Sequence, residues 1–195
     1  MDNTAQRPLL VLDLDETLVH AEEFAKALSG LTPDFTTSEY VVYKRPHLDE
    51  FLSRMWKHYD IAVWSAAGTL YVNRVVEVIF ADHKQPVFVF SGVRTTRRFD
   101  HDRMEAYYIK DLKKVRKKGF DLRRVLIVDD LQLNAQRNFG NAVYVDEFNG
   151  EQDDKELLLL ADYLERLAAS PNFRVVEKRY WRLETQKRQS EKNPA

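Results

Sequence analysis

The sequence predicts an α/β domain built on a central, mostly parallel sheet. Short apolar runs alternate along the chain with segments of helical spacing, which is the pattern of strands joined by crossover helices. Several of these runs have no polar member, which is typical of strands that are buried on both faces. The expected strands of this sheet are residues 9–12, 61–64, 87–90, 125–128 and 142–145. With 195 residues, 44% of them apolar, the chain is long enough for one domain with a sizeable core.

The first strand, residues 9–12, leads into a segment that favours a short helix at 21–28, ended by Ser29 and Gly30. Residues 40–43 have the composition of a strand. Pro46 suits the first turn of the helix that follows. Its apolar positions then recur on one helical face, namely Leu48, Phe51, Leu52, Met55 and Trp56.

The second strand, 61–64, ends at Ser65, and Thr69 suits the cap of the next helix. The apolar positions of that helix are Val72, Val75, Val76 and Ile79. The third strand, 87–90, precedes residues 91–103, whose arginines and lack of periodicity predict a surface loop.

Residues 111–118 predict a basic helix that ends at Gly119. The strand at 125–128 runs into Asp129 and Asp130, and helical patterns follow at 131–139 and 153–169. We expect residues 1–172 to form the domain and residues 173–195 to form a charged tail, helical and partly docked. Apolar residues that can dock the tail are Val175, Val176, Tyr180, Trp181 and Leu183.

Composition excludes several classes of function. Thirty Lys and Arg balance 31 Asp and Glu, so the net charge of −1 gives no overall attraction to nucleic acid or to an anionic membrane. The absence of cysteine excludes thiolate zinc sites, disulfides and Cys nucleophiles. The polar first residues lack the apolar core of a signal peptide, and no apolar run approaches the roughly 18 residues of a membrane span. We therefore expect a soluble protein of a reducing compartment, by default cytoplasmic, or nuclear if the source is eukaryotic.

Three strands end in groups that can do chemistry. Asp13 and Asp15 follow the first strand, Ser65 the second, and Asp129 with Asp130 the fourth. Because ligands bind beyond the carboxyl ends of parallel strands, we expect these groups to share one site. Each pair alone has a simpler interpretation, since Asp residues commonly start turns.

Carboxylates held close together need a cation or a proton between them. An aspartate at a strand end can attack phosphorus, and Mg²⁺ bound by oxygen ligands would neutralise both anionic reactants. Asp13 is then the nucleophile and a metal ligand. Asp15 would protonate the leaving oxygen and activate water, and Thr17 would hold Asp15 through a local hydrogen bond.

The segment 13–20, Asp-Leu-Asp-Glu-Thr-Leu-Val-His, resembles motif I of the haloacid dehalogenase superfamily, in the form found in the small phosphatases of the RNA polymerase II C-terminal domain. Residues 44–52, 108–112, 125–130 and 141–145 resemble later segments of the same branch, in the same order. The resemblance implies a Rossmann-like three-layer fold with a small β-hairpin insertion and no large cap domain. It departs from the family at Leu131-Gln132, at Ser65-Ala66-Ala67 and over 97–107.

By this resemblance, Asp13 is the nucleophile and Asp15 the general acid and base, whose backbone carbonyl also binds the metal. Ser65 matches the hydroxyl that holds a phosphoryl oxygen, and Thr17 also belongs to the phosphate-binding group that we predict. Lys110 matches the lysine that neutralises nucleophile and phosphate, although a surface lysine is the simpler interpretation in so basic a stretch.

The resemblance further makes Asp130 a direct Mg²⁺ ligand and Asp129 its supporting neighbour. Arg94 is a candidate substrate-side arginine, with a solvated loop charge as an equal alternative. Residues 113–118 form a basic run that could bind a phosphate backbone. We favour a solvated helix face instead, because the total charge is balanced and no aromatic residue interrupts the run.

We expect a Mg²⁺-dependent phosphomonoester hydrolase that acts on phosphoserine or phosphothreonine in proteins. Fifty positions separate Asp15 from Ser65, enough for a helix and a hairpin flap but too few for a large lid, which favours bulky substrates. The alternatives are nucleic-acid ends or small phosphorylated metabolites as substrates, and a catalytically silent binding module. The sequence makes no prediction of oligomeric state.

Overall fold

The structure, a computed structural model, describes residues 7–101 and 104–192. Its centre is a parallel sheet in the order β10-β9-β1-β5-β6. The strands are β1 (Leu9–Leu12), β5 (Asp60–Trp64), β6 (Val89–Phe90), β9 (Val125–Asp129) and β10 (Ala142–Tyr144). All five predicted strands are confirmed, although β6 is reduced to two residues. Leu12 pairs with Val63 on one side and with Val128 on the other, so the chain ends that follow β1, β5 and β9 meet at one edge.

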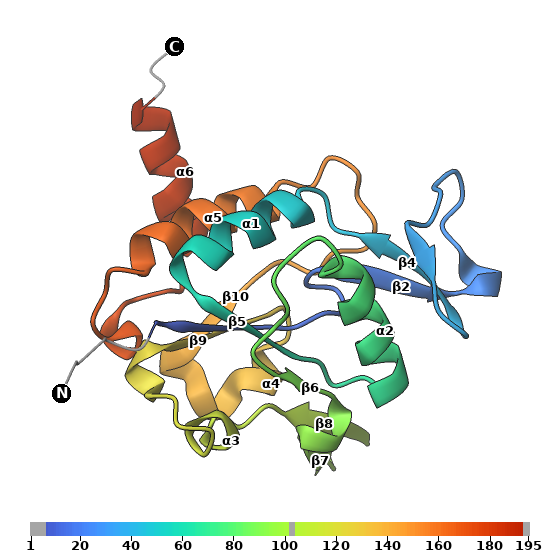
Figure 1. Ribbon diagram of the computed structural model, residues 1–195, viewed down its shortest axis with the longest axis horizontal. Coiled ribbons are helices and arrows are strands. Elements are labelled where there is room, and N and C mark those ends of the chain that lie inside the picture. The colour runs from blue at the N-terminus through green and yellow to red at the C-terminus, as the bar shows by residue number, and fades with distance from the viewer. Residues whose placement is uncertain (1–6, 102–103, 193–195) are drawn as a thin grey trace.

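Helices cover both faces of this sheet and make three layers (Figure 1). One face is covered by α1 (Leu48–His58), α2 (Thr69–Ile79) and α5 (Glu156–Leu167), and the other by α3 (Lys113–Arg116) and α4 (Gln132–Ala135). Alternate residues of β1 divide between the layers: Leu10 and Leu12 join the first apolar cluster, Leu9 and Val11 the second. Each such side chain, fully buried, contributes about 1.5–3 kcal/mol to folding. The predicted three-layer α/β class is confirmed.

A small antiparallel sheet, which we call the flap, is inserted between β1 and α1. It contains β2 (Val19–Glu23), β3 (Phe35–Thr36) and β4 (Tyr40–Lys44), in the order β2-β4-β3. Of the helix predicted at 21–28, only the 3-10 turn Phe24–Lys26 forms, and the prediction is wrong over 21–23, where pairing of β2 with β4 overrides the local helix propensity. Within the described residues the flap is the only sheet inserted at this point, as expected for a domain without a large cap.

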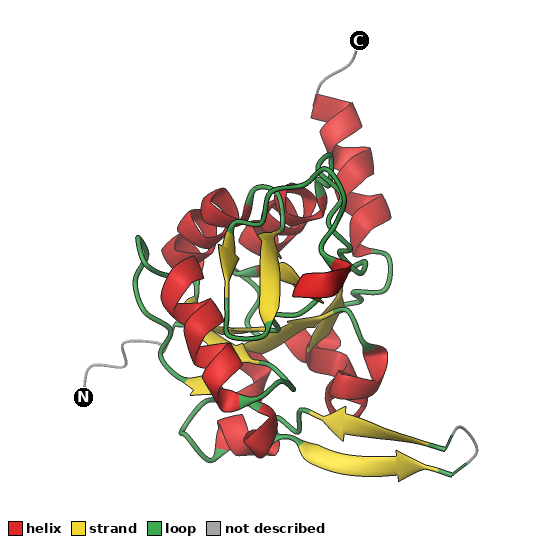
Figure 2. Ribbon diagram, turned by 90° about the vertical axis from the view of Figure 1, so that its right-hand side faces the viewer, coloured by secondary structure: helices red, strands yellow, loops and turns green. Residues whose placement is uncertain are grey.

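A second antiparallel pair, which we call the ribbon, consists of β7 (Thr96–Asp100) and β8 (Glu105–Ile109). Figure 2 shows it extending from the body of the domain. The predicted loop at 91–103 is therefore wrong at 96–100, while positions 102–103 lie outside the described residues. The ribbon escaped prediction because it packs little apolar surface against the core, so its sequence lacks the alternation that marks a half-buried strand.

Several helices are shorter than their patterns predict. The helical pattern at 131–139 becomes α4 followed by a 3-10 segment, Gln136–Asn141. Helix α5 begins at Glu156 rather than near Asp153.

Thr69 is not a cap, because Gly68 holds that position while the Thr69 hydroxyl bonds to the Ser91 hydroxyl at 2.8 Å. Gly119 follows α3 with φ of 96°, a conformation that glycine adopts without strain.

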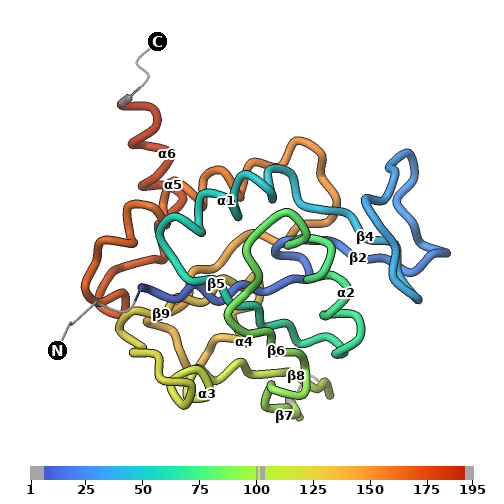
Figure 3. The backbone as a smooth tube through the Cα atoms, viewed as in Figure 1, coloured from blue at the N-terminus to red at the C-terminus, as the bar shows by residue number. Residues whose placement is uncertain are grey.

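The C-terminal segment contains a 3-10 turn, Phe173–Val175, and α6 (Trp181–Lys192). Phe173 and Trp181 are buried, and the Trp181 indole donates to the Tyr144 carbonyl at 2.9 Å. Three further apolar residues considered for docking, Val175, Tyr180 and Leu183, are exposed to solvent. The later turns of α6 extend away from the domain (Figure 3). Among the described residues, no helix combines the length and the apolar character needed to cross a bilayer.

Candidate active site

The loop after β1 is fixed by hydrogen bonds at nearly every residue. The Leu14 carbonyl accepts from the backbone N–H groups of Thr17, Leu18 and Val19. The Thr17 carbonyl accepts from the Arg45 guanidinium at 3.1 Å, and the Glu16 carbonyl from the Phe148 N–H at 2.8 Å. Glu16 has a φ of 54°, a left-handed conformation that costs free energy in a non-glycine residue and persists only where its surroundings impose it. The loop is thus rigid before any ligand arrives.

Lys110 connects the two acidic strand ends. It follows β8, is fully buried, and its Nζ lies 2.7 Å from Asp13 Oδ1 and 2.8 Å from Asp129 Oδ2. Asp13 comes from the end of β1 and Asp129 from the end of the neighbouring β9. Charge-assisted hydrogen bonds of this length fix the ammonium between the two carboxylates.

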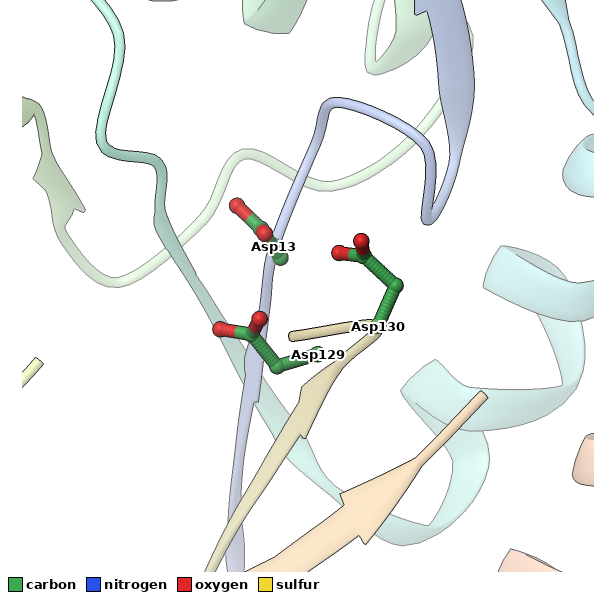
Figure 4. Close-up of side chains that lie close together, drawn as sticks. All are labelled: Asp13, Asp129 and Asp130. Carbon is green, nitrogen blue, oxygen red and sulfur yellow. The ribbon is translucent and has the colours of Figure 1, made fainter. Parts of the chain in front are cut away.

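Asp130 completes a group of three carboxylates. Oxygen atoms of Asp13, Asp129 and Asp130 all lie within 4.8 Å of one another. Figure 4 shows the three side chains converging on one region beyond the strand ends. One ammonium therefore faces three carboxylates, and the group carries excess negative charge.

The crowding of negative charge contributes to shifted pKa values within the group. Burial raises the pKa of Asp13 well above its ordinary value, and the charges of Asp129 and Asp15 add to that effect against the opposing charge of Lys110. Burial and Asp129 raise the pKa of Asp130 to about 6. Burial by itself would lower the pKa of Lys110, but the charges of Asp129 and Asp13 outweigh it and the net shift is upward.

A divalent cation fits this donor set. Hard carboxylate oxygens within one ion's reach, with too little positive charge beside them, suit Mg²⁺, which proteins usually hold through one or two carboxylates. Asp129 already has both oxygens engaged, by Lys110 on Oδ2 and by the Leu131 N–H and the Asn134 amide on Oδ1. Asp13 and Asp130 therefore have more coordinating capacity left than Asp129.

The Asp15 carboxylate is not a member of this group. Its Oδ1 accepts from the Tyr71 hydroxyl at 2.6 Å and its Oδ2 from the Ser65 hydroxyl at 2.9 Å. Ser65 Oγ accepts in turn from the Ala67 N–H at 2.9 Å. The two carboxylates of motif I are therefore separated by their partners, with Asp13 on Lys110 and Asp15 on two hydroxyl groups.

Two details of the sequence prediction need correction. Thr17 does not hold Asp15: it is fully buried, and its hydroxyl donates to Asp130 Oδ1 at 3.3 Å, across 113 positions of sequence. Sequence reasoning also missed Tyr71, which occupies the first turn of α2. The signal was available, because the first turn of a helix that follows a parallel strand lies at the sheet edge where the site forms.

Two asparagines that sequence reasoning also missed hold Lys110 from behind. The Asn134 side-chain amide donates to Asp129, and the Asn134 backbone carbonyl accepts from the Lys110 backbone N–H at 2.8 Å. The Asn138 amide donates to the Lys110 carbonyl at 2.7 Å. Both lie between the last two segments that resemble the family, 125–130 and 141–145, so no motif pointed to them.

A hollow of about 570 Å³ opens beside Asp15. Residues Thr37 to Tyr40 of the flap line one side, and Gly68 to Tyr71 line the other. The Tyr40 and Tyr71 rings meet edge to face with centroids 5.6 Å apart. The flap thus contacts the residue that holds Asp15.

Among the contacts of the described residues, Arg94 has none with the carboxylate group. It is exposed in the 3-10 turn Gly92–Arg94 after the edge strand β6, with its guanidinium 5.3 Å from the centroid of the Phe90 ring. Its backbone carbonyl accepts from Lys114 Nζ at 2.6 Å.

Known proteins with similar sequences are phosphatases by name. The CTD small phosphatase-like protein 2 of Dictyostelium discoideum is 30% identical over 174 residues, which cover 85% of this chain and 28% of that protein. The human carboxy-terminal domain RNA polymerase II polypeptide A small phosphatase 2 is 31% identical over 170 residues, covering 84% of this chain and 58% of that protein.

A solved structure supports the fold. The RNA polymerase II CTD phosphatase Fcp1 of fission yeast matches with a TM-score of 0.57 at 18% identity, over 95% of this chain and 55% of that one. The chain thus spans less than two thirds of each of these three proteins. Residues 8–174 match the model of the NLI interacting factor-like phosphatases, and the chain belongs to that family.

Proposed function

We propose that this chain is a Mg²⁺-dependent phosphomonoester hydrolase that works through an aspartyl-phosphate and acts on phosphoserine or phosphothreonine in proteins. The observation that carries the proposal is the buried Lys110 ammonium between Asp13 and Asp129, with Asp130 beside them and Asp15 held separately.

In the first half-reaction, an Asp13 carboxylate oxygen attacks the phosphorus and the bond to the substrate oxygen breaks. The leaving alkoxide takes a proton from Asp15. Because both Asp15 oxygens accept hydrogen bonds from Tyr71 and Ser65, delivery of that proton requires one of these bonds to be exchanged.

In the second half-reaction, Asp15 removes a proton from a water molecule that attacks the phosphorus of the aspartyl-phosphate. The acyl-phosphate bond breaks, inorganic phosphate leaves, and the Asp13 carboxylate is restored. Asp15 thus returns to the protonated form in which it began.

Lys110 holds Asp13 in position and offsets the negative charge of the attacking carboxylate and the phosphoryl oxygens. Ser65 is the candidate donor to a phosphoryl oxygen, in exchange for its bond to Asp15. Asp13, Asp130 and the Asp15 backbone carbonyl would hold Mg²⁺, with Asp129 and Thr17 supporting them. When bound, the ion supplies positive charge against the incoming phosphate.

A protein substrate is supported by two observations. The relatives named above are phosphatases of the RNA polymerase II C-terminal domain, which is a protein. The hollow of about 570 Å³ beside Asp15 is bounded by the small flap rather than by a closing domain, so a chain on either side of the phosphoresidue has room to pass.

The experiment measures turnover of an aryl phosphate, of phosphopeptides, of phosphorylated oligonucleotides and of sugar phosphates, with Mg²⁺ and with a chelator. We expect Mg²⁺-dependent turnover, highest on phosphopeptides. Asp13→Asn abolishes it without unfolding the protein, whereas Asp82→Asn, a matched change at an exposed position, leaves it unchanged.

Equal turnover across the substrates would reject the protein substrate. Undiminished turnover in Asp13→Asn would reject the mechanism. A complete lack of metal-dependent turnover would favour a silent binding module.

A further inference from the structure

Positive charge is concentrated in one segment of the chain. Residues 91–118 contain ten Lys and Arg and four Asp and Glu, a net charge of +6, whereas the whole chain carries −1 and the remainder therefore carries −7. Much of this charge is exposed on the ribbon and on the neighbouring α3, at Arg94, Arg97, Arg98, Lys113, Arg116, Lys117 and Lys118. The balanced total thus conceals one strongly basic surface.

The ribbon adds aromatic rings to that charge. Arg97 pairs with Tyr108 across the two strands, and Arg98 pairs with Tyr107. Since neighbouring residues of a strand point to opposite faces, each face of the ribbon presents one arginine beside one tyrosine. The residues 113–118 alone have no aromatic member, but the ribbon that carries these rings begins beside α3, where Lys114 Nζ donates to the Arg94 carbonyl at 2.6 Å.

The rings are accessible. Phe99 is 44% exposed and Tyr108 is 37% exposed, both high values for large aromatic side chains. Phe99 stacks edge to face with His101 at 5.1 Å, and a shallow hollow of about 430 Å³ lies among Arg97, Arg98, Phe99 and His101. An isolated two-stranded pair is marginally stable in water, so exposed rings on it are costly unless they serve binding.

We propose that the ribbon, together with α3, binds single-stranded nucleic acid. Arginine and lysine along a surface follow a phosphate backbone, and exposed aromatic rings between them stack on unpaired bases. An acidic peptide such as polyglutamate would satisfy the charges but offers no planar partner for Phe99 and Tyr108. A duplex keeps its bases stacked internally and would also leave the rings unused.

The ribbon is adjacent to the active site in the chain but separate from its chemistry. Ile109 ends β8, and the buried Lys110 follows it directly. Arg97, Arg98 and Phe99 belong to the opposite strand and contribute no contact to the carboxylate group. Nucleic acid bound here would hold the enzyme beside a substrate without itself being hydrolysed.

The experiment measures fluorescence anisotropy of a labelled single-stranded oligonucleotide of mixed sequence, as RNA and as DNA, over a range of salt. We expect the full chain to bind with a strong salt dependence. Arg97→Gln with Arg98→Gln should weaken binding about tenfold and lower the slope of log K against log salt by about 1.4, at roughly 0.7 per phosphate contact. Phe99→Ala should weaken binding about tenfold while leaving that slope unchanged.

Matched controls lie on α6 and just before it. Lys187→Gln with Arg188→Gln removes the same charge from exposed positions, and Tyr180→Ala removes an exposed ring; neither should alter binding. Turnover of an aryl phosphate should be equal in all variants, which shows that each is folded.

Four results would overturn the proposal: no binding at low salt, equal loss in the control variants, equal affinity for a duplex, or equal competition by polyglutamate. The last would assign the surface to acidic polypeptides instead.

Discussion

Two buried cations flank the loop after β1, and their surroundings differ in charge. Arg45 is matched by one carboxylate: its Nε and Nη2 donate to the two oxygens of Asp154 at 3.0 and 2.8 Å, and its Nη1 donates to the Thr17 carbonyl. Its guanidinium also lies 5.4 Å from the centre of the Phe148 ring. Lys110, equally buried, faces Asp13 and Asp129 with Asp130 close by.

The difference separates a structural ion pair from a reactive one. The Arg45 pair is neutral and bidentate, so it is complete as it stands and fixes the loop. The Lys110 group has more carboxylates than the ammonium can neutralise, which is what the proposed function requires of a site for a cation and an incoming phosphate. The number of opposing charges around a buried cation, more than its depth, indicates its role here.

The largest effect is expected for Lys110→Met. Loss of the ammonium should lower turnover about 10²–10³-fold and destabilise the fold by about 3–5 kcal/mol, because Asp13 and Asp129 are left buried without compensation. Mg²⁺ should recover part of that stability by replacing the lost positive charge. Thermal unfolding with and without Mg²⁺ measures this recovery. A loss of stability in Lys110→Met, relative to the wild type, that is the same with and without Mg²⁺ would contradict the prediction.

Arg45→Met tests the other half of the comparison. It leaves the partly buried Asp154 carboxylate without its cation and should cost about 3 kcal/mol. Here Mg²⁺ should raise the melting temperature only as much as in the wild type, so the deficit persists. Recovery by Mg²⁺ equal to that of Lys110→Met would show that the two cations do not differ as we describe.

A smaller effect is expected for Tyr71→Phe, which removes one of the two hydroxyl groups on Asp15 while keeping the ring against Tyr40. If Tyr71 positions Asp15, kcat should fall about tenfold, with little change in KM and a displaced pH profile. Tyr40→Phe, which keeps the same ring contact, is the control. A uniform loss of activity at every pH would indicate a packing role only.

The smallest effect concerns Arg54, whose guanidinium joins α1 to Asp162 and Glu165 of α5. Because this cluster is partly exposed, Arg54→Leu should cost about 1 kcal/mol at neutral pH. Arg54 lowers the pKa of Glu165 and, against burial, that of Asp162. The stabilisation is therefore present above the unfolded-state values of about 4 and is lost as pH falls through the folded values. Urea unfolding at pH 7 and at pH 3 should show a smaller difference in the free energy of unfolding between wild type and variant at the lower pH. A difference that is the same at both pH values would exclude the ion pairs as its cause.

Much of the site could be anticipated because a parallel sheet gathers its strand ends at one edge. The positions of the strands in the sequence were enough to predict a shared edge for Asp13, Ser65, Asp129 and Asp130. Thr17 shows the limit of this reasoning. Its hydroxyl bonds to Asp130, which is distant in sequence, although Asp15 lies only two positions away in the chain.

Both antiparallel insertions were harder to predict than the sheet, for different reasons. In the flap, β2 has good helix formers and becomes a strand only because β4 pairs with it. In the ribbon, both faces carry polar and aromatic residues, so no apolar period marks the strands. Asn134 and Asn138 escaped because their roles depend on contacts that no local pattern encodes, whereas Tyr71 could have been found from its place in the first turn of α2, at the sheet edge.

The central claim is that Asp13 forms the bond to phosphorus while Asp15 moves the protons. Asp15→Asn tests it with an aryl phosphate, whose leaving group needs no proton. We predict a rapid burst of one equivalent of the phenolate, followed by slow turnover, with a phosphoryl group found on Asp13 by mass spectrometry of the quenched protein. The double variant with Asp13→Asn should show neither burst nor label. A variant that turns over without a burst, or a phosphoryl group on any other residue, would contradict the account.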